Sequence, residues 1–220
     1  ALAARCKPAN QVGGDYYDFI PTNHNLMIKD KDSADAQANR WAMVIGDVMG
    51  KGVPAGLIMT MMRGMLRGEV LHLNSPARIL QNLNRVMYAD LDNSSRFITL
   101  FYSEYDPQKR LLSYSNAAHN PPLWWHAATK TVSRLDTNGM LIGLEANSQY
   151  ENGHIYLEVG DVIIYYTDGL TDAASASGER FDEESLILAF STACKHYKEP
   201  QEILDCLFNT IKQFIGSDRQ

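Results

Sequence analysis

Three aspartates of this chain stand beside glycine, where an apolar segment begins or ends. Asp15 follows a glycine pair, Asp47 interrupts an apolar run just after Gly46, and Asp168 precedes Gly169 at the end of another apolar run. Three carboxylates gathered in one place would repel one another, and a hard divalent cation with oxygen ligands is the usual remedy. If these residues meet at one edge of a sheet, they predict a site for Mg²⁺ or Mn²⁺. The simpler alternative for Asp47 is a turn in which the carboxylate only caps the next helix.

Other phosphate and hydrolase chemistries fit the sequence less well. The segment 50–52, Gly-Lys-Gly, lacks the spacing of a P-loop. The segment 116–120 invites comparison with a histidine-kinase-like ATPase, but it follows the glycine motifs, whereas that family's asparagine motif precedes them. His119 has no metal-spaced histidine partner, so a structural role in a turn is favoured over a zinc site. No Gly-x-Ser-x-Gly motif supports a serine hydrolase.

The aspartates need strands and helices to position them, and the first half of the chain supplies both. We expect strands at 16–20 and 41–45, a surface loop over 29–39, and helices over 54–73 and 76–91. The first of these helices is apolar almost all round, which predicts burial on most of its surface. The second is amphipathic and begins at Ser75-Pro76, a typical helix start.

The second half of the chain reads mostly as antiparallel strands followed by two helices. The pattern predicts a hairpin of 97–105 with 111–115, strands at 122–126 and 131–135, a second hairpin of 156–159 with 162–166, and helices at 182–194 and 200–214. Helices, many strands and then helices again indicate an α+β protein with two packed sheets. We expect a single domain over 1–220.

Composition narrows the class of partner. Hydrophobic residues make up 45% and charged residues 21% of the chain, the net charge is -6, and the basic residues are scattered. These values disfavour binding to nucleic acid or to an anionic membrane surface. No apolar run approaches the length of roughly 20 residues that spans a bilayer. Cys6, Cys194 and Cys206 are odd in number and lack metal or redox spacing, which indicates a reducing, cytoplasmic compartment.

Four segments together resemble a known family. They are Val12-Gly-Gly-Asp-Tyr-Tyr-Asp-Phe19, Ile45-Gly-Asp-Val-Met-Gly-Lys-Gly-Val-Pro-Ala55, Asn116-Ala-Ala-His-Asn-Pro-Pro122 and Tyr166-Thr-Asp-Gly-Leu-Thr-Asp-Ala173. In order and approximate spacing they are similar to the SpoIIE/RsbU-like branch of the PPM (type 2C) metal-dependent protein serine/threonine phosphatases. The resemblance implies a four-layer α-β-β-α sandwich of two antiparallel sheets flanked by helix pairs.

The resemblance also implies a two-metal centre of Mn²⁺ or Mg²⁺. In the matching positions, Asp47 would bridge both metals, the Val48 carbonyl would bind one of them and Asp168 the other. Asp15 would hold metal-bound waters or bind a metal directly. Asp15, Asp47 and Asp168 are therefore the implied catalytic residues, and the implied reaction is attack of an activated water on the phosphorus of phosphoserine or phosphothreonine.

One feature departs from the family pattern. The family usually closes with an Asp-Asp-x-Thr segment that completes the second metal site, and Asp218 does not replace it. Either the chain is a fragment of a longer regulatory protein and lacks the final strand, or it is a degenerate relative with a weakened second site. The intact acidic positions elsewhere favour the fragment.

Partners follow from the same resemblance. The implied substrate is a small phosphorylated anti-sigma-factor antagonist-like protein in bacterial stress or developmental signalling, with an upstream sensory or receiver module and a homodimer as further partners. The helices over 54–73 and 76–91 match the family's regulatory switch region. The alternative is a catalytically silent module that binds a regulatory partner. No arginine clamp for phosphate is obvious, and Arg5 and Arg63 are candidates only by elimination.

Overall fold

The computed structural model describes residues 1–6, 13–22 and 40–216. The chain divides into two compact units. We call 8–121 with 136–157 the large-sheet unit, and 1–7 with 122–135 and 158–220 the small-sheet unit. The loop predicted over 29–39 lies outside the described residues.

The large-sheet unit is built on five antiparallel strands in the order β1-β2-β3-β4-β7. Their bounds are Tyr16–Pro21, Trp41–Val48, Ile98–Asp106, Leu111–Ala117 and Gly153–Tyr156. Side chains of β2 alternate between the two faces, as the strand period requires. Ala42, Val44 and Val48 therefore point into one buried core.

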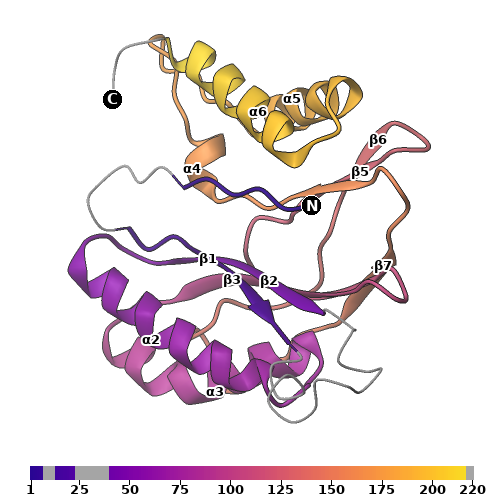
Figure 1. The fold of residues 1–220 in the computed structure, drawn as a ribbon. Coiled ribbons are helices and arrows are strands. Elements are labelled where there is room, and N and C mark those ends of the chain that lie inside the picture. The colour runs from indigo at the N-terminus through magenta and orange to yellow at the C-terminus, as the bar shows by residue number, and fades with distance from the viewer. Residues whose placement is uncertain (7–12, 23–39, 217–220) are drawn as a thin grey trace. The chain divides into compact units, whose positions relative to one another are not determined.

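Two helices cover that face of the large sheet (Figure 1): α2, Val53–Val70, and α3, Pro76–Asn93. Both begin with a proline in the first turn, where its missing N–H costs no hydrogen bond. The expected burial of most of α2 is wrong, because Val53 and Leu57 remain 64% and 66% exposed. Only one stripe of α2 packs on the sheet, so its opposite face is left to solvent.

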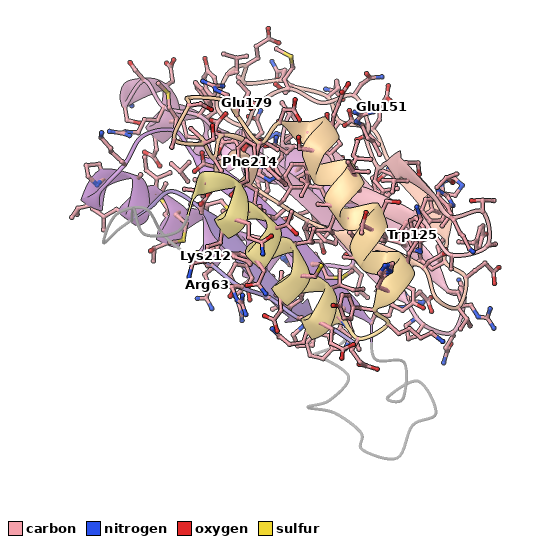
Figure 2. The ribbon with its side chains drawn as sticks, turned by 90° about the horizontal axis from the view of Figure 1, so that it is seen from above. Arg63, Trp125, Glu151, Glu179, Lys212 and Phe214 are labelled. Carbon is pink, nitrogen blue, oxygen red and sulfur yellow. The ribbon has the colours of Figure 1, made fainter. Side chains whose placement is uncertain are left out.

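The small-sheet unit contains three antiparallel strands in the order β6-β5-β8, with three helices. The strands are β5, Leu123–His126, β6, Thr131–Arg134, and β8, Val162–Ile164, and the helices are α4, Asp168–Thr171, α5, Glu183–His196, and α6, Pro200–Ile215. Trp125 of β5 lies in the core beneath α5 and α6, and Phe214 of α6 packs against that core (both labelled in Figure 2). The core is completed by Phe190 and Leu207, which are almost fully buried.

The predicted hairpin of 156–159 with 162–166 is wrong. β7 pairs with β4, whereas β8 pairs with β5 in the other sheet. The turn between β7 and β8 explains why these strands lie in different sheets. Its Asp161 carboxylate accepts the backbone N–H of Ala127 at 2.9 Å and the indole N–H of Trp124 at 3.1 Å. These bonds tie the turn to β5, so the chain leaves the large sheet before β8 begins.

The α+β class and the two antiparallel sheets, each carrying a helix pair, agree with the prediction. The single domain stays a prediction. Among the described residues, no helix has the length and apolar character that crossing a membrane requires.

Candidate metal centre

Asp47 lies one residue from the end of β2 and is paired with β3. β1 and β3 flank β2, and Asp47 lies opposite Thr99 of β3. The next residue, Val48, is fully buried, and its N–H donates to the Gly14 carbonyl oxygen at 3.2 Å. The Met49 N–H then donates to the Phe97 carbonyl at 2.9 Å. The backbone around Asp47 is therefore fixed by the sheet.

Gly14 packs directly on residues 47–50, at and just after the end of β2, which we call the Asp47 turn. A Cβ atom at position 14 would lie 2.3 Å from the Val48 carbonyl oxygen and 2.7 Å from Asp47 Oδ1. Both oxygens thus face the same small space, which only glycine leaves open. Asp15 follows at once and precedes Tyr16, which pairs with Gly46. The structure thus brings Asp15, Asp47 and Val48 to one end of the β1–β2 pair.

These donors fit a hard divalent cation. Carboxylate and backbone carbonyl oxygens are the ligands that Mg²⁺ and Mn²⁺ prefer. Asp15 is exposed and Asp47 is partly exposed, so both can be reached from solvent. Within 1–6, 13–22 and 40–216, no three His, Cys, Asp or Glu side chains gather as a metal-holding group. The large-sheet unit therefore offers part of a site.

Asp168 belongs to the small-sheet unit. It is exposed and is the first residue of α4, a short helix that sequence reasoning missed. Its carbonyl oxygen accepts the Asp172 N–H at 2.7 Å and the Thr171 hydroxyl at 3.1 Å. The side chain thus stands at a helix start four residues after β8, rather than at the strand end itself. Its convergence with Asp15 and Asp47 stays a prediction.

The segment 116–120 supports β3, the strand that pairs with Asp47. The Asn116 side chain donates to the His119 carbonyl at 2.9 Å and to Asp136 Oδ1 at 2.7 Å, and accepts the His119 N–H at 2.9 Å. His119 is buried, and its Nδ1 lies 2.8 Å from the hydroxyl oxygen of Thr99, the residue opposite Asp47. The structural role expected for His119 agrees with this arrangement.

The arginines named by elimination are engaged elsewhere. Arg5 bonds Asp205, and Arg63 lies 3.3 Å from Asp18. Arg96, which the sequence did not single out, instead reaches the Asp47 turn, where its Nη1 donates to the Met49 carbonyl at 2.7 Å. No motif marks Arg96, because its position depends on how the loop after α3 returns to the sheet.

Comparison with known proteins places the chain in a family. The sequence model of the family described as "Stage II sporulation protein E (SpoIIE)" matches residues 37–220. The chain belongs to the SpoIIE family. The phosphoserine phosphatase RsbU of Bacillus subtilis (strain 168) is 34% identical over 188 residues, which cover 84% of this chain and 51% of RsbU. The phosphoserine phosphatase RsbP of the same organism is 26% identical, with coverage of 76% and 39%. The chain thus spans about half the length of RsbU and less of RsbP.

Solved structures show the fold of this SpoIIE-family chain. The SiaA-PP2C domain of Pseudomonas aeruginosa has a TM-score of 0.74 at 22% identity, covering 97% of this chain and 79% of that one. The RsbU and RsbW domains of Rv1364c from Mycobacterium tuberculosis give 0.72 at 21% identity, covering 96% and 53%. The chain therefore has the PP2C fold, and the resemblance drawn from its four motifs is confirmed.

Proposed function

We propose that this chain is a metal-dependent protein phosphatase domain that hydrolyses phosphoserine or phosphothreonine. The observation that carries the proposal is the space at Gly14, which the Asp47 carboxylate and the Val48 carbonyl both face and which Asp15 adjoins. A metal-dependent hydrolase that acts on a phosphate monoester needs oxygen ligands of this kind for its cations. The names of RsbU and RsbP, both phosphoserine phosphatases, support the choice of substrate group.

Each residue of the site has a definable task. Asp15, Asp47 and the Val48 carbonyl would hold Mn²⁺ or Mg²⁺, and Asp168 would complete the set from the small-sheet unit. When bound, such a cation lowers the pKa of water toward about 7 and offsets the charge of the phosphoryl oxygens. Gly14 keeps the Asp47 and Val48 oxygens unobstructed. The hydrogen bonds of Val48 and Met49 fix the turn, so little reorganisation is needed when substrate binds.

The proposed substrate is a small phosphorylated protein of the anti-sigma-factor antagonist class, in bacterial stress or developmental signalling. An upstream sensory or receiver module, dimerisation and a cytoplasmic location belong to the same proposal. The half of RsbU that this chain does not match leaves room for such a module.

Hydrolysis of a phosphoserine protein with and without Mn²⁺ tests the proposal. The 220-residue chain should be compared with one to which an Asp-Asp-x-Thr segment of the family pattern has been added, and para-nitrophenyl phosphate serves as a substrate that needs no protein docking. Mn²⁺-dependent release of phosphate by either chain supports the phosphatase. If both chains fold and bind the phosphoprotein without hydrolysing it, the catalytically silent binding module is the correct reading.

A further inference from the structure

We propose that Arg96 binds the phosphoryl group of the substrate at the Asp47 turn; this inference rests on the proposed phosphatase function. Arg96 lies in the loop between α3 and β3, and its guanidinium reaches the turn that follows β2. The Nη1 atom donates to the carbonyl oxygen of Met49, two residues beyond Asp47. A cationic group is thus held at the backbone two residues beyond Asp47.

The turn is shaped to accept this guanidinium. Gly50 has a φ of 107°, and a Cβ atom there would lie 2.1 Å from Arg96 Nη1. Any other residue at position 50 would be strained in its backbone and would press on the guanidinium. The Arg96 N–H donates to the Leu91 carbonyl at 2.9 Å, which fixes the start of the side chain as well. The Arg96 side chain is therefore held at its backbone by Leu91 and at its guanidinium by the turn.

The charge of Arg96 is not neutralised by a carboxylate within the described part of the chain. Three other arginines of the large-sheet unit do have such partners: Arg40 pairs with Asp106, and Arg63 and Arg67 pair with Asp18. The partner of Arg96 is a backbone carbonyl, which occupies one of the five N–H donors of a guanidinium. The side chain is partly exposed, so the others can meet a ligand.

A phosphoryl group is the ligand that this arrangement suits. The planar guanidinium matches phosphate oxygens with two parallel hydrogen bonds. A phosphoserine carries nearly two negative charges at neutral pH, which a guanidinium at this turn would attract. Arg96 would attract the phosphoryl group and orient it over the turn.

The test measures phosphate binding in the parent chain, Arg96→Gln and Arg96→Lys. Arg85→Gln is the matched control, because Arg85 is an exposed arginine on α3 of the same unit. Inorganic phosphate is the probe. Its inhibition of turnover is measured at saturating Mn²⁺, and its binding to the metal-free protein is then measured through the amide signals of Met49 and Gly50. Thermal unfolding and direct Mn²⁺ titration accompany each variant.

Arg96→Gln should weaken phosphate binding by about tenfold or more, as expected when a charged hydrogen-bond donor is lost. The KM for the phosphoprotein should rise in parallel. The phosphate affinity of Arg96→Lys should lie between those of the parent and Arg96→Gln, and the phosphate affinity of Arg85→Gln should equal that of the parent. Mn²⁺ affinity should not change. Unchanged phosphate affinity in Arg96→Gln would overturn the inference, as would a loss of Mn²⁺ affinity alone, which would assign Arg96 to shaping the turn.

The metal-free titration separates this inference from the phosphatase proposal. If the parent binds phosphate through Arg96 but hydrolyses nothing, the anion site stands and the phosphatase is wrong. If the parent hydrolyses phosphoserine and Arg96→Gln binds phosphate normally, only the role of Arg96 is wrong.

Discussion

At the scale of single residues, Gly14 controls the space beside Asp47. Gly14→Ala would place a methyl group 2.3 Å from the Val48 carbonyl oxygen, so the turn must move. We expect Mn²⁺-dependent turnover to fall by about 100-fold, because a displacement of about 1 Å at a reacting centre can cost that much. Steady-state kinetics measure the effect. Gly13→Ala is the control, since its Cβ would meet only the Asp15 nitrogen at 3.8 Å and turnover should be near normal.

Glu104 gives a pH-dependent prediction. Burial raises the pKa of this carboxyl above its usual 4.5, although the hydroxyl of Tyr102 donates to it at 2.5 Å. Between the unfolded and folded pKa values the folded protein holds a proton that the unfolded chain releases. Stability is therefore greatest below the unfolded value and falls as pH rises through the folded one.

Glu104→Gln removes this titration while its amide oxygen can still accept the Tyr102 hydroxyl. We expect the variant to gain stability relative to the parent as pH rises above the usual value of 4.5. Urea unfolding at a series of pH values measures the difference. If the free energies of unfolding of parent and variant differ by a constant amount across that range, Glu104 has the same pKa in the folded and the unfolded protein.

The sequence could single out the residues of the candidate metal centre better than the residues around it. Asp47 and Asp15 were found because glycine beside a carboxylate at the end of an apolar run is a local pattern. Arg96 and Asp136 make their contacts with Met49 and Asn116 only after distant loops fold back onto the sheet. Such contacts leave no periodic signal in the chain.

At the scale of elements, α2 is tied to β1 through Asp18. Arg67 makes two hydrogen bonds to the Asp18 carboxylate, at 2.8 and 2.7 Å, and the Tyr16 hydroxyl donates to the same group at 2.8 Å. The Asp18 side chain is 13% exposed. Burial, followed by the bond to Asp18, raises the pKa of Tyr16. Asp18 therefore connects the helix to the strand that begins just after Asp15.

Asp18→Ala should lower the free energy of unfolding by about 2 kcal/mol, because it leaves a partly buried arginine and tyrosine without their acceptor. Chemical denaturation measures the change. Asp205→Ala, which breaks the exposed pair with Arg5, should cost less than about 1 kcal/mol. Equal losses in the two variants would contradict a special role for Asp18 in holding α2.

Of the two predicted hairpins, the one between β3 and β4 is correct and the one between 156–159 and 162–166 is wrong. The β3–β4 hairpin follows from its turn at Asp106, whose carboxylate accepts the N–H groups of Gln108 and Lys109. The separation of β7 from β8 depends instead on the bonds of Asp161 to Ala127 and Trp124. Those partners lie more than thirty residues earlier in the chain, and neighbouring apolar strands alone favoured a hairpin.

At the scale of the whole molecule, the proposed metal centre would take residues from both compact units. Asp15, Asp47 and Val48 come from the large-sheet unit, and Asp168 comes from the small-sheet unit. The ordered motifs along the sequence predicted the fold because they span both units and occur together in one family. We propose from the same motifs that Asp47 and Asp168, which lie more than a hundred positions apart, bind the same pair of cations.

A double-mutant cycle on Asp47→Asn and Asp168→Asn tests that claim most directly. Turnover of a phosphoserine protein is measured at saturating Mn²⁺ for the parent, both single variants and the double variant, with Asp92→Asn on α3 as an exposed control. We predict that each single variant loses about 100-fold or more in kcat and that the double variant is no worse than the poorer single, because residues that act as one unit are not additive. Losses that multiply as independent effects, or full activity in either single variant, would contradict a shared metal centre.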